Sequence, residues 1–314
     1  MAEVIKKATR EGYGDGLVKL GEKYDDFIVL DADLAAATKS GTFKKAFPER
    51  FYDCGIAEQN MVSIAAGIAA TGKKVFASSF AMFAAGRAFE QIRNSVGYPN
   101  LNVSICATHA GISVGEDGAT HQCNEDIALM RTIPGMTIIN PADVVEAEKA
   151  LEAAYKLDGP SYLRFGRLAV PVVFDENYKF EIGKAVELKE GNDVTIIATG
   201  LMVAEALEAY EILKAEGINA RVINMATIKP LDNEAVIKAA KETGLIITAE
   251  EHSVIGGLGS AVCDVVAENY PVKVVKIGVK DVYGKSGPAN TLLDEFGLRG
   301  KDIALAVKKA LSEK

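Results

Sequence analysis

The sequence predicts an α/β protein with two consecutive open, mostly parallel sheets that are flanked by helices. Short β-rich runs alternate with Ala-rich runs of helical spacing along the chain, which is typical of parallel strands connected by helices. A polar stretch with Pro, Gly and charged residues near residue 185 separates two such series. With 314 residues and 49% hydrophobic content, the chain is long enough for two compact domains.

The first series occupies residues 1–185 and alternates strands with helices. Asp143 is expected as a helix N-cap, because Glu146 follows three residues later and completes a capping pattern. Strands are expected at 27–33, 74–80, 102–109, 136–142 and 161–167, and helices at 61–70, 82–96 and 142–157.

The second series, residues 186–314, has the same layout without a sequence repeat. Its most polar cluster is Glu250, Glu251 and His252, which we interpret as a network at a strand end rather than a site. Strands are expected at 194–200, 220–227, 244–251 and 272–279, and helices at 203–217, 232–242, 259–270 and the C-terminus.

The composition indicates a cytoplasmic protein that binds neither nucleic acid nor membranes. The formal net charge is −8 and the basic residues are dispersed, so no polyanion-binding stripe is expected. The four cysteines have no CxxC spacing, which favours free thiols in a reducing compartment. The N-terminal residues lack the apolar core of a signal peptide, and the longest apolar runs fall short of a membrane span.

Glu58 stands at the head of an otherwise apolar helical run, in "CGIAEQNMVSIAAGIAATG". One interpretation is an acid in a first helical turn, where it interacts favourably with the helix dipole. The other is a carboxylate at the carboxyl end of a strand, the edge at which open α/β sheets bind ligands. Because a buried carboxyl without a partner is costly, burial of Glu58 would favour the functional interpretation.

Phe80 and Phe83 lie at another strand-to-helix switch, three residues apart. A Phe pair at helical spacing is commonly part of a core. Beside Glu58 it would instead suit a stacking surface for a flat heterocycle.

The segment "CATHAGISVGEDGATHQCNEDIALMR" contains two of the three histidines of the chain, His109 and His121, and several glycines between them. Glycine allows close backbone approach, histidine exchanges protons near neutral pH, and Asp117 can accept hydroxyl hydrogen bonds. The pattern favours a sugar or phosphate site. A metal site is the competing interpretation, but no second cluster completes a ligand set.

Taken together, these motifs resemble the transketolase family. "DCGIAEQNM", "SSF" with "RAFEQIR", "ATHAGISVGEDGATHQ" and "IPGMTIINPAD" carry the resemblance, which extends over essentially the whole chain. It implies a thiamine diphosphate pyrimidine-binding domain at 1–185 and a transketolase C-terminal domain at 186–314. In the family, a diphosphate- and metal-binding domain normally precedes this region. We expect that domain to be carried by a separate subunit here, as in split transketolases with two subunits.

Two further motifs are weak. Gly14-Asp15-Gly16 resembles the start of the metal–diphosphate motif of thiamine diphosphate enzymes, but the Asn that this motif needs is missing, and we interpret the segment as helical. "GGLGSAV" is an incomplete dinucleotide-binding fingerprint.

The resemblance implies the residues that bind the cofactor. In the family, the Glu of this motif hydrogen-bonds N1′ of the aminopyrimidine and favours the imino tautomer, whose nitrogen removes the thiazolium C2 proton. Glu58 corresponds to this residue and is therefore expected to be catalytic, while a third aromatic residue used by some members falls near Gly86 here. The other expected cofactor contacts are Asp33, Ile56, Phe80, Phe83 and His121.

The resemblance also implies the residues that bind the substrate. His109 and His121 are expected to contact the sugar and to handle protons, with Asp117 recognising hydroxyl groups. Arg10 and Arg167 correspond to cations that bind the substrate phosphate, with Arg164 as a companion. A Ser that assists phosphate binding in some members has Thr38 and Ser40 as its nearest counterparts.

The implied reaction is transfer of a two-carbon ketol unit from a ketose phosphate such as xylulose 5-phosphate to an aldose phosphate such as ribose 5-phosphate, as in the pentose phosphate pathway. A separate N-terminal subunit would hold the diphosphate together with Mg²⁺ or Ca²⁺. We expect a heterotetramer, with this chain forming a dimer when alone.

Three alternatives remain. A 1-deoxyxylulose-5-phosphate synthase-like protein shares "GIAEQ" but differs in the histidine loop. The beta subunit of a 2-oxo acid dehydrogenase is also a separate chain that forms half of an active site, but its Glu motif and its histidine loop differ from those of this sequence. A non-catalytic, transketolase-like binding subunit would have no need for Glu58, His109, Asp117 and His121 together.

Overall fold

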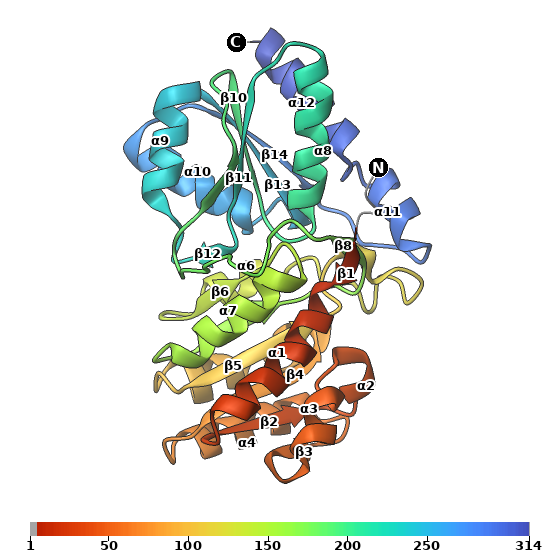
Figure 1. Cartoon of the computed structure of the whole chain (residues 1–314), viewed down its shortest axis with the longest axis vertical. Helices are drawn as coiled ribbons and strands as arrows, with labels where there is room; N and C mark the ends of the chain where they lie inside the picture. Colours follow the sequence, from red (N-terminus) through yellow and green to blue (C-terminus); the bar gives the residue numbers. More distant parts are fainter. Residues whose placement is uncertain (1–4, 314) are drawn as a thin grey trace.

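The computed structural model describes residues 5–313, so the first four residues of the N-terminal stretch considered above lie outside it, as does Lys314. Each of the two series forms a central sheet with helices on both faces, the first in the lower half and the second in the upper half of Figure 1. The predicted fold class is confirmed. Within the described residues, no helix has the length and apolar character needed to cross a membrane.

The first sheet has seven strands in the order β12-β6-β7-β5-β4-β2-β3. The strands β2 to β7 pair in parallel, whereas β12 is antiparallel to β6. The carboxyl ends of the parallel strands therefore lie at one edge of the sheet. The strand bounds are Phe27–Asp31 for β2, Phe51–Asp53 for β3, Lys74–Phe80 for β4, Val103–Thr108 for β5, Thr137–Ile139 for β6, Ser161–Arg164 for β7 and Thr227–Lys229 for β12.

Helices cover both faces of this sheet because strand side chains alternate in direction. In β2, Phe27 and Val29 belong to the core under α1 (Thr9–Lys23) and α7 (Val144–Lys156), while Leu30 belongs to the core under α4 (Glu58–Ala69). A Cβ at Gly12 would lie 2.3 Å from the Val144 carbonyl oxygen, so glycine allows α1 and α7 to pack closely. Shorter elements on this domain are α2 (Ala35–Thr38), α3 (Gly41–Ala46), η1 (Pro48–Arg50), η4 (Ile112–Val114) and α6 (Asp126–Arg131).

The segment predicted as one helix at 82–96 is helical but mostly of the wider π type. It comprises η2 (Met82–Arg87), α5 (Phe89–Gln91) and η3 (Ile92–Gly97). The spacing of apolar residues predicts which side of a helix is buried, here Ala84, Ala85 and Ala88. It does not distinguish a hydrogen bond to the fourth preceding carbonyl from one to the fifth. The N-cap prediction is confirmed, since the Asp143 carboxylate accepts the Glu146 N–H at 2.8 Å.

The second sheet has five strands in the order β14-β13-β10-β11-β9. Helices α8 and α12 pack together on one face, and α9 and α10 on the other (Figure 1). The sequence did not predict the short helix α11. The bounds are Val186–Lys189 for β9, Val194–Ala198 for β10, Met202–Ala215 for α8, Ala220–Asn224 for β11, Asn233–Thr243 for α9, Leu245–Ser253 for β13, Leu258–Asn269 for α10, Lys273–Val279 for β14, Ala289–Glu295 for α11 and Gly300–Ser312 for α12.

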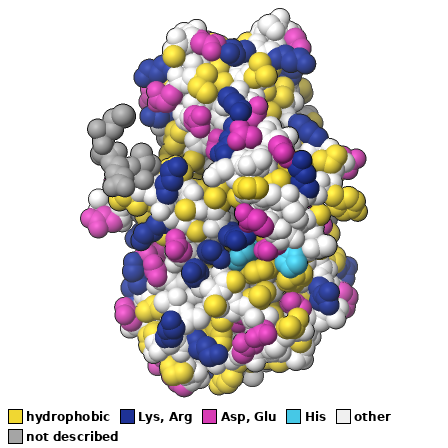
Figure 2. Space-filling model, turned by 90° about the vertical axis from the view of Figure 1, so that its right-hand side faces the viewer, with side chains coloured by type: hydrophobic (Ala, Val, Ile, Leu, Met, Phe, Trp, Pro, Cys, Tyr) yellow, Lys and Arg dark blue, Asp and Glu magenta, His cyan; other side chains and the backbone are white. Residues whose placement is uncertain are grey.

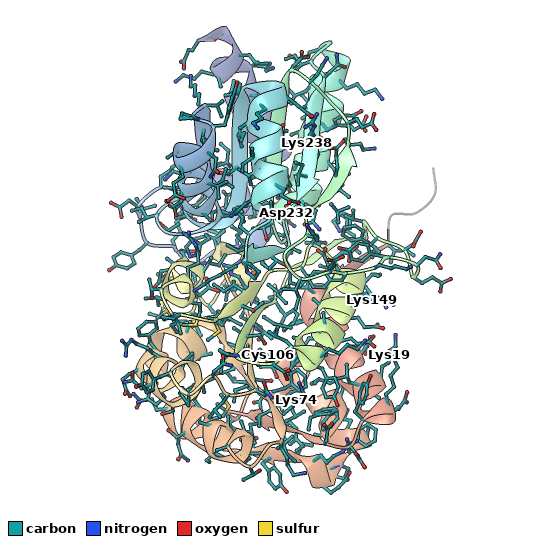
Figure 3. The ribbon with its side chains drawn as sticks, turned by 90° about the vertical axis from the view of Figure 1, so that its left-hand side faces the viewer. Lys19, Lys74, Cys106, Lys149, Asp232 and Lys238 are labelled. Atoms are coloured by element: carbon teal, nitrogen blue, oxygen red, sulfur yellow. The ribbon has the colours of Figure 1, made fainter. Side chains whose placement is uncertain are left out.

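The two halves share backbone pairing. The run 220–227, predicted as one strand, is divided: β11 stays in the second sheet and β12 pairs with the edge of the first. Within the first half, a small ribbon joins β1 (Lys6–Ala8) to β8 (Ala169–Pro171). All four cysteines are free, and Cys106 lies deep in the lower half (Figure 3), where burial raises the pKa of its thiol.

A buried ion pair lies where the halves meet. Arg164 Nε donates to Asp126 Oδ2 at 2.8 Å, and Arg164 Nη2 donates to the Glu251 carbonyl oxygen of β13 at 2.9 Å. The Tyr162 hydroxyl donates to the same carboxylate oxygen at 2.8 Å. Burial alone would raise the pKa of Asp126, but the Arg164 guanidinium holds it below its usual value.

Replacing Arg164 by Met leaves the Asp126 carboxylate buried without its cation. Because an uncompensated buried charge is strongly unfavourable, we expect the Arg164→Met variant to lower the free energy of unfolding by about 3–5 kcal/mol. Denaturant titration followed by circular dichroism measures this. The control is Lys19→Met, which breaks an exposed ion pair to Glu148 and should cost less than about 1 kcal/mol. Equal, small losses of unfolding free energy in both variants would contradict the conclusion that Arg164 compensates the buried charge of Asp126.

Candidate functional site

The carboxyl-terminal edge of the first sheet gathers the residues that the sequence singles out. Asp33 follows β2, Glu58 follows β3, Phe80 ends β4, His109 follows β5 and Arg167 follows β7. These strands are parallel neighbours, so all five residues lie along one edge. This is the edge at which open α/β sheets bind ligands.

Glu58 is the first residue of α4 and is only 3% exposed. In the part of the chain that the structure describes, its carboxylate forms neither a hydrogen bond nor an ion pair. The dipole of α4 compensates a fraction of the cost of burying a carboxylate, but not the loss of its hydrogen bonds to water. The environment of Glu58 is therefore that of a carboxylate whose hydrogen-bond partner is a bound molecule.

The turn before Glu58 is fixed by Asp53. Its Oδ1 accepts the N–H of Asp33 at 3.1 Å and the N–H of Gly55 at 2.9 Å, which joins the ends of β2 and β3. The Ile56 side chain is 83% exposed and Asp33 is exposed as well. Both side chains are thus available beside Glu58 for contacts outside this chain.

Phe80 and Phe83 form an aromatic wall next to α4. Their rings stack with centroids 6.0 Å apart and planes inclined by 15°. The helix that begins with Glu58 packs on η2, and Gln59 Nε2 donates to the Arg87 carbonyl oxygen at 3.3 Å. A cavity of about 440 Å³ opens here, lined by Met82, Phe83, Arg87 and Thr120.

His109 is buried and fixed by three contacts. Its ring stacks on Phe80 with centroids 3.8 Å apart. Its Nε2 lies 3.1 Å from Arg10 Nη1 and its Nδ1 lies 2.9 Å from Thr108 Oγ1. Because a guanidinium only donates, Nε2 accepts the hydrogen bond and the ring proton is on Nδ1. Burial, followed by Arg10 and Arg167, lowers the pKa of His109 to about 3, so the imidazole is neutral near pH 7.

Two guanidinium groups surround this imidazole. Arg10 Nη1 also donates to the Ala37 carbonyl oxygen at 2.9 Å, while its buried Nε has no partner within the described residues. Arg167 donates to the Val114 carbonyl oxygen and lies 3.9 Å from an Asp117 carboxylate oxygen. Burial, and then the charge of Arg167, lowers the pKa of Arg10. Two cations held this close together favour an anion between them, and a phosphate ester suits a guanidinium fork.

His121 contacts both rings of the aromatic pair. Its ring meets Phe83 edge-on at 5.3 Å and Phe80 at 6.4 Å, and its Nδ1 is 2.9 Å from Thr120 Oγ1. Figure 2 shows histidine at the surface where the two halves meet, next to hydrophobic and basic side chains. The structure thus brings together His109, His121, Arg10, Arg167, Asp117 and the two phenylalanines.

Other candidate residues are bonded within the protein. Thr38 and Ser40 are fully buried, and both hydroxyls donate to Asp31 Oδ2 at 2.8 Å. Burial raises the pKa of Asp31 to about 6. Arg164 is occupied by Asp126, so none of these three side chains is presented at the edge. Sequence reasoning assigned no role to Asp53 and Thr108, which stand within the quoted motifs and fix their conformation.

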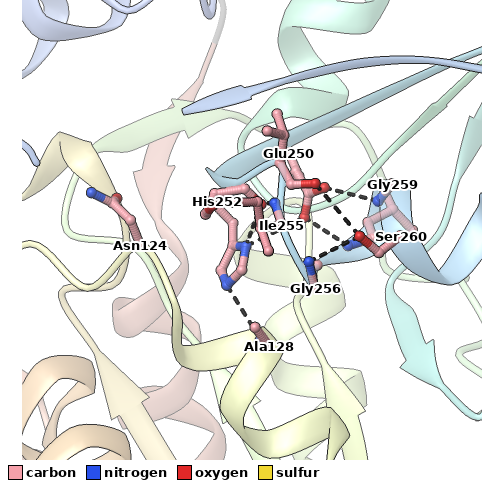
Figure 4. A network of polar contacts seen from close by, with 12 residues as sticks. Asn124, Ala128, Glu250, His252, Ile255, Gly256, Gly259 and Ser260 are labelled. Carbon is pink, nitrogen blue, oxygen red and sulfur yellow. Dashed lines mark hydrogen bonds and ion pairs between the residues drawn. The ribbon is translucent and has the colours of Figure 1, made fainter. Parts of the chain in front are cut away.

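A second polar cluster, at the end of β13, is structural, as the sequence predicts. The Glu250 carboxylate accepts the N–H groups of Leu258 at 2.7 Å and Gly259 at 2.8 Å, at the start of α10 (Figure 4). His252 Nε2 accepts the Ala128 N–H at 3.3 Å and Nδ1 lies 2.7 Å from the Ser253 carbonyl oxygen. Neither this cluster nor any other group of His, Cys, Asp and Glu among residues 5–313 forms a set of three that could hold a metal ion.

Comparison with known families identifies both halves. Residues 5–172 match the model of the transketolase pyrimidine-binding domain, and residues 183–303 match that of the transketolase C-terminal domain. These matches define the class as a two-domain α/β protein with a pyrimidine-binding domain followed by a C-terminal domain. The chain belongs to the transketolase family.

Similar proteins include separate transketolase subunits. The chain is 51% identical to a protein of Methanocaldococcus jannaschii described as a transketolase C-terminal section, with 98% of each chain covered. It is 44% identical to the 6-deoxy-6-sulfo-D-fructose transketolase subunit SqwH of a Clostridium species, covering 97% of this chain and 95% of that one. A solved split-gene transketolase, described as an inactive β4 tetramer, is 54% identical, with a TM-score of 0.91 over 97% of this chain and 98% of that chain.

A longer relative shows how much of a transketolase this chain covers. The human transketolase is 42% identical over 312 residues, which are 98% of this chain and 50% of the human protein. The chain therefore spans about half the length of that relative.

The lowered pKa of His109 gives a spectroscopic prediction. We expect the imidazole signals of His109 to stay constant between pH 5 and 8, because its pKa is about 3. In an Arg10→Gln variant the neighbouring cation is gone, so the pKa should rise, while Lys19→Gln at the surface should change nothing. Heteronuclear NMR of labelled histidine measures this.

The lowered pKa of His109 also determines how the stability of the folded protein changes with pH. The unfolded state, with an ordinary histidine pKa of 6.5, binds more protons than the folded state between pH 6.5 and about 3. The contribution of His109 to stability is therefore lost as the pH falls through this window. Ordinary titration of His109 near pH 6.5 in the folded protein would contradict the proposed tautomer and its environment.

Proposed function

We propose that this chain is the C-terminal subunit of a split transketolase, which transfers a two-carbon ketol unit from a ketose phosphate to an aldose phosphate. The observation that carries the proposal is the buried carboxylate of Glu58, which has no partner among the described residues and lies at the start of the helix beside the Phe80–Phe83 wall. The similarity to transketolase C-terminal sections supports the split arrangement.

The residues at this edge fit the aminopyrimidine of thiamine diphosphate. Glu58 would share a proton with N1′ of the ring, which satisfies its buried carboxyl, and Phe83 would stack on the ring face. Ile56, Phe80 and His121 would complete the contacts. When bound, the cofactor supplies a thiazolium carbon that holds the two-carbon unit while the C2–C3 bond of the donor breaks.

The residues around His109 fit a phosphorylated sugar. Arg10 and Arg167 would bind the phosphate, with charges that match its dianion. Neutral His109 presents a lone pair at Nε2, for which a sugar hydroxyl would compete with Arg10. His121 would move protons near the donor carbonyl, and Asp117 would accept hydroxyl hydrogen bonds.

A second subunit would supply the diphosphate side of the site, with Mg²⁺ or Ca²⁺, and Asp33 would face the thiazolium from this chain. Tyr52 and Ile56 are 53% and 83% exposed on either side of the Asp53–Gly55 turn, and apolar exposure of this kind suits an interface. The β4 tetramer of the similar protein supports self-association. We propose a cytoplasmic heterotetramer of the pentose phosphate pathway, with domains at 1–185 and 186–314.

The deciding experiment is ketol transfer from xylulose 5-phosphate to ribose 5-phosphate with thiamine diphosphate and Mg²⁺. The chain is assayed alone and then mixed with the diphosphate-binding subunit encoded beside it or purified with it. We expect activity only in the mixture, because each subunit would hold half of the cofactor. Sedimentation of the mixture would check that the two chains form a heterotetramer.

Each other outcome has a distinct meaning. Activity of the chain alone would refute the requirement for a partner. An associated but silent mixture would next be tested with 6-deoxy-6-sulfo-D-fructose as donor, the substrate named for the similar Clostridium subunit. Turnover of that donor only would correct the substrate, whereas silence with every donor would favour a non-catalytic subunit.

Glu58→Gln tests the catalytic carboxyl. We expect kcat/KM to fall by about 10²–10⁴, the range of a lost acid–base contribution. The free energy of unfolding of the chain alone should not fall, because the wild-type carboxylate is buried without a partner in this chain. Steady-state kinetics of the mixture gives kcat/KM, and denaturant titration of the variant gives its free energy of unfolding.

The matched control is Glu234→Gln, at an exposed acid in the first turn of α9 in the second domain. It should retain full activity. If Glu58→Gln also retained it, the proposed mechanism would be wrong, and a purely structural role for Glu58 would instead be seen as a loss of stability.

A further inference from the structure

We propose that Glu251 is a positioning residue, through which the C-terminal domain holds the loop that carries the substrate-binding side chains. This inference rests on the proposed function, because it concerns the loop between His109 and His121. Among the described residues, no hydrogen bond or ring contact joins the second domain to Glu58, Phe80 or His109. A role in positioning would explain why the site needs this domain.

The first contact is a buried hydrogen bond between the domains. Glu251 lies near the end of β13, and its Oε1 accepts the Ser113 N–H at 2.6 Å. Both residues are buried, and Ser113 lies in η4, four residues after His109. A Cβ at Gly111 would lie within 2.5 Å of this carboxylate, so glycine at φ +80° is what allows the carboxylate to reach the loop.

The second contact fixes the same loop from its other end. Gln122 Nε2 donates to the carbonyl oxygens of Ile112 and Lys285, both at 3.0 Å. Gln122 directly follows His121, and Lys285 belongs to the segment between β14 and α11. The backbone of Gly284 packs against the Gln122 amide, where a Cβ would lie 1.8 Å from its oxygen.

These two contacts hold the loop on both sides of the residues that face the substrate. Between them, the Val114 carbonyl oxygen accepts from Arg167, and Asp117 lies 3.9 Å from the same guanidinium. A shift of η4 would therefore move the acceptor that orients Arg167. The loop of the first domain is thus shaped by the second domain, and Glu251 is the only charged group of the second domain bonded to η4 among residues 5–313.

The orientation of Glu251 depends on the buried ion pair. Arg164 donates to the Glu251 carbonyl oxygen at 2.9 Å while it is paired with Asp126. The strand end is therefore anchored independently of the carboxylate. Removing the carboxylate should release η4 without detaching β13.

Hydrogen exchange on the full chain tests this without any activity measurement. In Glu251→Ala the buried Ser113 N–H loses its acceptor, so we expect the amides of 111–115 to exchange roughly tenfold faster or more. The exchange rates of the amides in β2, β4 and β5 should keep the same ratios to one another as in the wild type. Glu251→Gln has a side chain of the same length and keeps one acceptor oxygen, so it should retain the protection of these amides. If the Ala variant does not fold, the Gln variant is compared directly with the wild type.

The matched control is Glu250→Ala. Glu250 is the neighbouring buried acid, but it bonds the start of α10 and not the loop (Figure 4). It should lower overall stability while leaving the relative protection of 111–115 intact. Unchanged protection in Glu251→Ala, or the same loss in both variants, would overturn the proposal.

Kinetics of the assembled enzyme provide a second readout. We expect Glu251→Ala to raise KM for the sugar phosphate by roughly tenfold or more, with a smaller effect on kcat, because Arg167 and Asp117 lose their fixed support. The half-saturating concentration of thiamine diphosphate should stay unchanged. If the wild-type mixture shows no ketol transfer but the exchange result holds, the proposed function fails and the positioning role of Glu251 stands.

Discussion

The buried pair of Arg164 and Asp126 is the interaction on which the arrangement of the two domains depends. It joins the end of β7 to α6, and the same guanidinium donates to the end of β13 in the second domain. A buried carboxylate is costly without a cation beside it, so the guanidinium that pairs with Asp126 is held in place and also fixes the end of β13. The site follows from this geometry, because β7 and β13 together define the space into which the loop after β5 must fold.

Charge is distributed unevenly along the site, and this separates two chemical tasks. The arginines and the neutral His109 lie together, so under the proposed function anion binding and proton acceptance would share one end of the site. Glu58, apolar neighbours and the phenylalanine wall lie at the other end, where a carboxyl meets a flat apolar surface. The stacked contact of His109 with Phe80 is the bridge between them.

Local sequence patterns predicted the helices and strands. The bonding of individual side chains and the pairing of some strands depend on contacts between residues distant in sequence. Short β-rich runs such as residues 27–30 predicted the strands, and the end of each strand placed Glu58 and His109. The hydroxyls of Thr38 and Ser40 could be assigned only once Asp31 was seen to accept from both. Likewise, a uniform run at 220–227 cannot show that the chain changes sheets, because the register of β12 depends on the partner strand β6.

Under the proposed function, the buried acid at Glu58 would connect catalysis to assembly. In the isolated chain Glu58 is only 3% exposed and its carboxylate has no partner among the described residues, so few water molecules can replace the missing hydrogen bonds. A proton shared with a bound aminopyrimidine would remove that penalty, so ligand binding would stabilise the folded chain in proportion to its affinity. If the diphosphate end is held by another subunit, the same free energy favours association of the two chains. Cofactor binding and subunit assembly are then thermodynamically linked through one side chain, and each strengthens the other by the same factor.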